Sequence, residues 1–139
     1  MEHILKKAIE TAKKTEGLRN FKLGAVLFDK GVIVSAKGNC TKTHPALRYY
    51  TPWPILHAES RAILSHGLDN CHNLELMVVR INQTGDLTMS KPCKVCQELI
   101  KDVGIKRVWY SDWEGRIVSQ VQDAQMGDKT YHSSYLQKV

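Results

Sequence analysis

The sequence lacks a long hydrophobic run, since its longest uninterrupted apolar stretches, at residues 25–28 and 76–79, contain four residues each. A helix that spans a bilayer needs about 20 such residues, so we predict no membrane span. The first ten residues also lack the apolar core and the small-residue cleavage site of a secretory signal. We therefore expect a cytoplasmic protein.

Proline, glycine and aromatic residues are also scarce. The chain has 4 Pro and 9 Gly, and 7% of its residues are aromatic. No internal repeat, low-complexity stretch or linker-like segment divides it, which argues against collagen, coiled coil and disorder. A length of 139 residues with 42% hydrophobic content suits one globular domain with its own core. We predict a single domain over residues 1–139.

Charge of one sign does not accumulate in runs. The net charge is 20 − 14 = +6, but Lys and Arg occur singly or in pairs rather than in runs of five or more. An excess of basic residues favours polyanionic partners. Because these residues are scattered along the chain, they suit a solvated surface equally well. Composition alone leaves a nucleic-acid partner open.

Hydrophobic periodicity predicts alternating helices and strands. The predicted helices cover residues 4–12, 55–65 and 92–103, and the predicted strands cover 21–28, 32–37, 74–81, 106–111 and 116–121. Residues 39–54 show neither the helical period nor the alternation of a strand, so we predict a long loop there. A helix between two strands implies a parallel pair, whereas the short turn at residues 112–115 implies an antiparallel last strand. We predict an α/β fold, a three-layer αβα sandwich around a mixed five-stranded sheet.

Two short fragments each open a predicted helix: His57-Ala58-Glu59 and Pro92-Cys93-Lys94-Val95-Cys96. Helices that follow parallel strands begin at the same edge of a sheet, so we expect the two fragments to converge. One imidazole and two thiolates suit Zn²⁺, and three protein ligands leave a position open for water. Glu59 is close to such a metal without being needed as a ligand, which suits a general acid/base. The sequence predicts a catalytic zinc site.

The remaining cysteines allow an alternative. A purely structural zinc site would need a fourth ligand, which Cys71, Cys40 or His44 would have to supply. That interpretation leaves Glu59 unexplained. Because no secretory signal is present, we expect no disulfides and interpret Cys40 and Cys71 as small buried residues.

A His-x-Glu motif followed by Pro-Cys-x-x-Cys is a signature of zinc-dependent nucleobase deaminases. From about residue 21 to residue 111 the chain resembles the cytidine/deoxycytidylate deaminase superfamily. The resemblance implies hydrolytic deamination with one Zn²⁺ per chain, held by His57, Cys93 and Cys96, with Glu59 moving the proton. It also implies that the backbone amide of Ala58 contacts the base and that Asn39 contacts the sugar.

Further substrate contacts are expected in the long loop. His44, Arg48 and Trp53 are candidates, each with a plainer interpretation as a surface or loop-anchoring residue. The loop at residues 39–45 resembles small phage and bacterial deoxycytidylate deaminases. An antiparallel last strand, by contrast, is typical of deaminases of free cytidine, while deoxycytidylate and tRNA adenosine deaminases use the parallel form.

We expect a free (deoxy)cytidine nucleoside or nucleotide as substrate, converted to the uracil product and ammonia. One alternative is a deaminase of cytosine or adenine in single-stranded DNA or RNA, tRNA included. Such an enzyme would combine a basic groove with aromatic stacking platforms. Another alternative is a non-catalytic zinc-binding module. No membrane partner is expected. Because relatives with such short chains often complete their pockets across subunit contacts, we expect a homo-oligomer.

Overall fold

A computed structural model describes residues 1–15, 22–39 and 57–121 of the chain. The helices are α1 (Glu2–Lys13), α2 (Ala58–His66), the 3₁₀ turn η2 (Leu68–Asn70) and α3 (Lys94–Asp102). The strands are β1 (Lys22–Asp29), β2 (Val32–Gly38), β3 (Glu75–Ile81), β4 (Leu87–Thr88), β5 (Arg107–Ser111) and β6 (Ile117–Val121). None of the helices in these ranges is long and apolar enough to cross a bilayer. Residues 40–54 of the predicted loop at 39–54, and all residues after 121, lie outside the described ranges.

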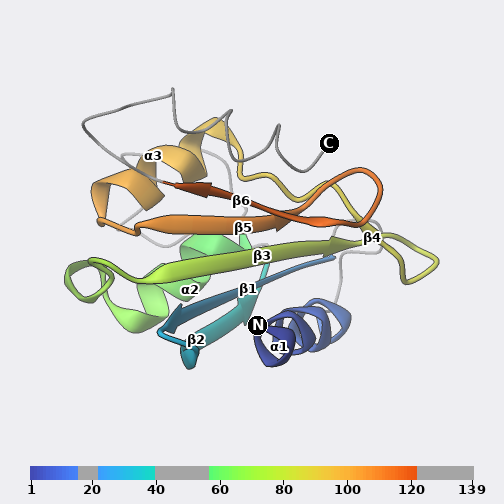
Figure 1. Cartoon of the computed structure of the whole chain (residues 1–139), viewed down its shortest axis with the longest axis horizontal. Helices are drawn as coiled ribbons and strands as arrows, with labels where there is room; N and C mark the ends of the chain where they lie inside the picture. Colours follow the sequence, from blue (N-terminus) through green and yellow to red (C-terminus); the bar gives the residue numbers. More distant parts are fainter. Residues whose placement is uncertain (16–21, 40–56, 122–139) are drawn as a thin grey trace.

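The strands form one mixed sheet in the order β2-β1-β3-β5-β6 (Figure 1). β3 and β5 run parallel, and the helix α3 connects them. The other strand pairs are antiparallel, including β5 with β6, as the short turn predicted. The sheet has six strands rather than five, because β4 pairs with the end of β3 at Arg80 and Ile81. The strand β4 has only two residues, which is too short for an alternating hydrophobic pattern, so the sequence did not predict it.

Helices cover both faces of the sheet, which confirms the three-layer arrangement (Figure 1). On one face, the apolar side of α1 packs against alternate residues of β1 and β3, with Ile4 and Ala8 against Val26 and Met77. The opposite face supports α2 and α3. Their contacts form the larger core cluster of buried residues: Leu23, Ala25, Leu27, Ala58, Ala62, Ile63, Cys71, Leu74, Leu76, Val78, Leu99, Ile100, Ile105, Val108, Tyr110 and Val118.

The helix α1 approaches the sheet most closely at Gly24. A Cβ atom built on Gly24 would collide with the carbonyl oxygen of Ala8 and would lie 2.7 Å from the backbone nitrogen of Ala12. Any larger residue would therefore push α1 away from β1. This position requires glycine for close packing rather than for an unusual backbone angle.

Two helices begin later than the sequence predicted. The second helix begins at Ala58 rather than 55, and the third begins at Lys94 rather than 92. The reason is that His57 and Cys93 have extended backbone, with ψ of 158° and 168°, and so act as the N-cap residues. Both motif residues consequently lie at helix ends, where their side chains are not committed to a helical face.

Candidate metal centre

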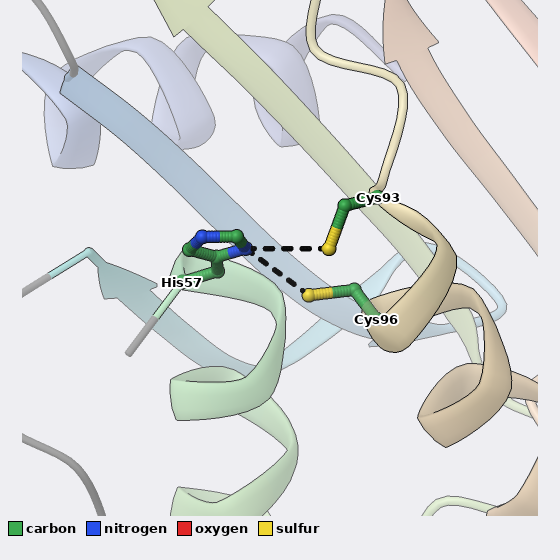
Figure 2. A group of neighbouring side chains, drawn as sticks. All are labelled: His57, Cys93 and Cys96. Atoms are coloured by element: carbon green, nitrogen blue, oxygen red, sulfur yellow. Dashed lines mark hydrogen bonds between the residues drawn. The ribbon is translucent and has the colours of Figure 1, made fainter. Parts of the chain in front are cut away.

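The N-terminal ends of α2 and α3 bring one histidine and two cysteines together. His57 is the N-cap of α2, Cys93 is the N-cap of α3, and Cys96 lies one turn into α3. Figure 2 shows the two sulfur atoms directed toward the same imidazole nitrogen, while the other ring nitrogen points away. His57 is half-buried, Cys93 is exposed and Cys96 is buried. The group is therefore closed on its inner side and open at Cys93.

The spacing of the three donor atoms fits a tetrahedral metal ion. His57 Nδ1 lies 3.3 Å from Cys96 Sγ and 3.7 Å from Cys93 Sγ, and all three donor atoms lie within 4.8 Å of one another. Tetrahedral Zn²⁺ with ordinary Zn–S and Zn–N bonds separates its nitrogen and sulfur ligands by about 3.6 Å. Two thiolates and an imidazole are also the donors that Zn²⁺ prefers. The residues present fit zinc in both geometry and chemistry.

The protonation of the metal-free group also favours cation binding. A hydrogen bond from the Cys96 thiol lowers the pKa of Cys93 to about 4, with further help from His57 against the opposing effect of burial. The Cys93 thiolate in turn raises the pKa of His57 through a hydrogen bond. The hydrogen bond between Cys96 and Cys93, followed by burial, raises the pKa of Cys96. The group therefore holds one thiolate before any metal arrives, and metal binding must displace the Cys96 proton.

Glu59 lies in the first turn of α2 and is almost completely buried, with 3% of its surface exposed. Its Oε1 atom has no hydrogen-bond partner among the described residues. Burial is the main cause that raises the pKa of Glu59, and the nearby His57 opposes it. A buried carboxylate oxygen without a partner is costly, so its retention beside the donor group points to a role there.

Hydrogen bonds fix the loop that leads into α3. Ser90 is buried, and its hydroxyl donates to the carbonyl oxygen of Val78 at 2.8 Å and accepts from the backbone N–H of Ser111 at 2.8 Å. Gln97 Nε2 donates to the carbonyl oxygen of Pro92 at 2.7 Å, which ties the first turn of α3 to the preceding residue. Sequence reasoning missed Ser90 and Ser111, because serines at these positions have no pattern that distinguishes them from loop serines.

The other residues expected at the site fall into two groups. Asn39 is buried at the end of β2, where its Oδ1 accepts a hydrogen bond from the backbone N–H of Leu23 at 3.0 Å. Ala58 is the first residue of α2, so its N–H has no acceptor within the helix. The expected contacts of both with substrate stay predictions. The expected residues His44, Arg48 and Trp53, together with Cys40, lie outside the described residues.

Cys71 is a buried core residue, as predicted. It belongs to the larger core cluster, and its Sγ lies 3.3 Å from the carbonyl oxygen of Gly67. It is not a member of the donor group formed by His57, Cys93 and Cys96. A closed structural site with Cys71 as fourth ligand is therefore inconsistent with the fold.

Solved structures of deaminases resemble this fold. The dCMP deaminase of cyanophage S-TIM5, in complex with dCMP and dUMP, has a TM-score of 0.59 at 23% identity, over 81% of this chain and 80% of that one. A tRNA:A34 deaminase has a TM-score of 0.54 at 19% identity, over 81% and 76% of the two chains. A diaminohydroxyphosphoribosylaminopyrimidine deaminase/reductase of Thermotoga maritima has 0.53 at 28% identity, but only 29% of that chain is covered.

No curated protein matches the chain significantly. A family model does match, and it covers residues 1–112, which include the helices and strands around the donor group. Its description, cytidine and deoxycytidylate deaminase zinc-binding region, agrees with the His57, Cys93 and Cys96 group that the fold assembles. The chain therefore belongs to the cytidine and deoxycytidylate deaminase family, with zinc as its cofactor.

Proposed function

We propose that the protein catalyses the hydrolytic deamination of the cytosine base of a free (deoxy)cytidine nucleotide or nucleoside, releasing ammonia and the uracil product. The observation that supports this most directly is the pairing of a three-donor group with a buried carboxylate. His57, Cys93 and Cys96 supply three ligands, and the Oε1 atom of Glu59 is left without a partner among the described residues. Three ligands leave a coordination position for water, as in catalytic rather than structural zinc sites.

When bound, zinc lowers the pKa of a coordinated water molecule so that it can act as a nucleophile near neutral pH. The chain's own part is to move protons and to orient the base. Glu59 is in the right surroundings to accept a proton from water, because burial raises its pKa and so makes the carboxylate a stronger base. It would pass that proton to the ring nitrogen, then take a second proton from the hydroxyl group added to the base carbon and give it to the amino group, which leaves as ammonia. The backbone N–H of Ala58, at the start of α2, would orient the base.

Two observations bear on the substrate. The S-TIM5 structure contains dCMP and dUMP, a substrate and product pair of the proposed reaction type, which favours a nucleotide. The antiparallel last strand is instead the form expected for deaminases of free cytidine. A nucleotide and a nucleoside are both free small molecules, so the two observations agree on the class of substrate. We therefore place a pyrimidine nucleotide or nucleoside ahead of other substrates.

A nucleic-acid substrate is the second proposal, because a tRNA:A34 deaminase also resembles the fold. Such a substrate would favour cations around the donor group. Lys91 and Lys94 do flank Cys93 in the chain. Four other cations, however, line a cavity bounded by α1, the end of β2 and α2, and none of the residues that line it belongs to the donor group. This distribution favours a small substrate over a polynucleotide at the metal centre.

The experiment is a product assay on the zinc-loaded protein. Cytidine, deoxycytidine, CMP, dCMP and single-stranded oligonucleotides containing cytosine or adenine are compared by ammonia release and by chromatography of the product. We expect a free cytosine nucleotide or nucleoside to have a kcat/KM at least ten times that of either oligonucleotide. The Glu59→Gln variant, purified in parallel, controls for contaminating deaminases. A preference for an oligonucleotide would overturn the proposed substrate class.

A further inference from the structure

Cys93 is the donor of the metal centre that packing restrains least. Cys96 is buried and His57 is half-buried, whereas Cys93 is exposed. An exposed side chain has few neighbours that could hold it in one rotamer. Its sulfur nevertheless points toward His57, with 3.7 Å between Cys93 Sγ and His57 Nδ1 (Figure 2). The backbone of Cys93 must therefore do much to set the direction of this sulfur.

Both peptide groups next to Cys93 are hydrogen-bonded to one residue, Gln97. Its backbone N–H donates to the carbonyl oxygen of Cys93 at 2.8 Å, and its side-chain Nε2 donates to the carbonyl oxygen of Pro92 at 2.7 Å. The first is the ordinary bond between residues four apart in a helix. The second lies outside the helical pattern, because Pro92 precedes the N-cap residue of α3. Only the second bond depends on the side chain at position 97.

These two bonds restrain the backbone angles that direct the Cys93 side chain. Cys93 has a φ of −68° and a ψ of 168°. Rotation of the peptide group between Pro92 and Cys93 changes φ, and rotation of the next peptide group changes ψ. The Gln97 side chain therefore restrains φ, and its backbone N–H restrains ψ. With both angles held, only the χ1 angle of Cys93 is left, and it has three staggered values.

The chain that leads to Cys93 is also held on its other side. Ser90 is hydrogen-bonded to β3 and β5. Pro92 is buried, and its ring limits its own φ. The peptide group that follows Pro92 is not part of the sheet or of the helix, and the Gln97 amide determines its orientation.

We propose that Gln97 is a positioning residue for the metal. Its side-chain amide fixes the peptide group before Cys93, keeps the Cys93 sulfur directed at the donor group and so slows the loss of zinc through the open side of the site. Gln97 does not need to touch the metal for this effect. Partners that orient metal ligands typically contribute about 10–100-fold to metal affinity. This role requires Cys93 to be a zinc ligand but does not depend on the substrate or the reaction.

The test compares two donor-free variants, Gln97→Leu and Gln97→Met, with the matched control Glu98→Leu. Both Gln97 variants keep the backbone bond to Cys93 and lose only the bond to Pro92. The second variant makes the result independent of how leucine packs. Glu98 is exposed on the same helix, so the control introduces the same leucine and leaves that bond in place.

Two quantities are measured on each protein. The first is the rate at which the zinc-loaded protein transfers its metal to a chelating dye. The second is the absorption spectrum of the Co²⁺-substituted protein, whose bands depend on the type and geometry of the cobalt ligands. A merely structural role of Gln97 would not change the thiolate-to-cobalt band.

We expect both Gln97 variants to release zinc about tenfold faster than the original protein, with a weaker thiolate-to-cobalt band. The control should stay within about twofold and keep the original spectrum. Release within about twofold from both Gln97 variants would overturn the role of Gln97. Equal acceleration in Glu98→Leu would overturn it as well, because it would show a general weakening of α3. Faster release with an unchanged cobalt spectrum would contradict the positioning of the Cys93 sulfur. Because no turnover is measured, these outcomes do not depend on the proposed deamination.

Discussion

The hydroxyl groups of Ser90 and Ser111 lie 2.8 Å apart in the interior of the protein. Ser111, at the end of β5, also donates to the carbonyl oxygen of Thr88 at 2.6 Å, and Ser90 donates to that of Val78. The pair therefore joins β3, β4 and β5 to the loop that leads into α3. Cys93 follows Ser90 by three residues, so the sheet determines where this metal ligand lies.

Replacing Ser90 with Ala should destabilise the fold and weaken zinc binding. The substitution leaves the backbone N–H of Ser111 and the carbonyl oxygen of Val78 without their bonds to the Ser90 hydroxyl. An unsatisfied buried polar group costs about 1–3 kcal/mol, so we expect a loss of that order in the free energy of unfolding, measured in urea. Ser65→Ala, at an exposed position of α2, is the control. Equal stability of the two variants would contradict the role of Ser90.

The sequence predicted the metal centre well because its chemistry is local. His57 and Glu59 are two residues apart, Cys93 and Cys96 are three apart, and each pair opens a helix. The rule that helices after parallel strands begin at one sheet edge then brought the pairs together. The zinc cofactor, the mixed sheet and the antiparallel last strand are confirmed. The single domain over residues 1–139 and the homo-oligomer stay predictions.

Features that depend on long-range contacts could not be predicted in this way. The cavity bounded by α1, the end of β2 and α2 brings together Lys7, Lys37 and Arg61, whose separations in the chain have no period that would connect them. The pairing of Ser90 with Ser111 depends on the register of β5 beside β3. The predicted starts of the second and third helices were wrong by three and two residues, because apolar periodicity does not distinguish an extended N-cap from a first helical residue.

Gly24→Ala should destabilise the protein by more than the loss expected for an ordinary glycine substitution. The added Cβ would overlap the backbone of α1 at Ala8 and Ala12, and a backbone cannot move aside as a side chain can. We expect a loss of about 2 kcal/mol or more in the free energy of unfolding. Gly85→Ala is the comparison, since only its positive φ of 88° opposes the substitution there and no atom of the described residues lies within 4 Å of the added Cβ. A smaller loss for Gly24→Ala than for Gly85→Ala would contradict the close packing of α1.

Removal of zinc should make Cys93 reactive at mildly acidic pH. The pKa of Cys93 in the metal-free group is about 4, so at pH 6 this residue is mainly thiolate, whereas an ordinary cysteine reacts only as the pH approaches its pKa near 8.5. Burial raises the pKa of Cys71, which should remain unmodified. Iodoacetamide labelling at pH 6, mapped by mass spectrometry with and without a chelator, measures this. Labelling of Cys93 that is unchanged by chelation would count against it as a ligand.

Cys96→Ser should reduce the zinc content well below one ion per chain and lower the thermal midpoint. The variant replaces a soft thiolate donor with a hydroxyl, and zinc affinity contributes to folding stability. Cys71→Ser is the matched control, because Cys71 is buried but is not in the donor group. That control should lose stability while it retains zinc. Elemental analysis that shows equal zinc in both variants would exclude Cys96 as a ligand.

The most direct test of the proposed reaction is Glu59→Gln, which keeps the shape of the side chain but removes the proton-accepting carboxylate. We expect about one zinc ion per chain, as in the original protein, and a deamination rate lowered by at least a hundredfold, since general acid–base catalysis contributes about 10²–10⁴-fold. Zinc content and ammonia release are measured on the same preparation. A zinc-loaded variant that deaminates its substrate at the original rate would contradict the role of Glu59 and, with it, the proposed mechanism.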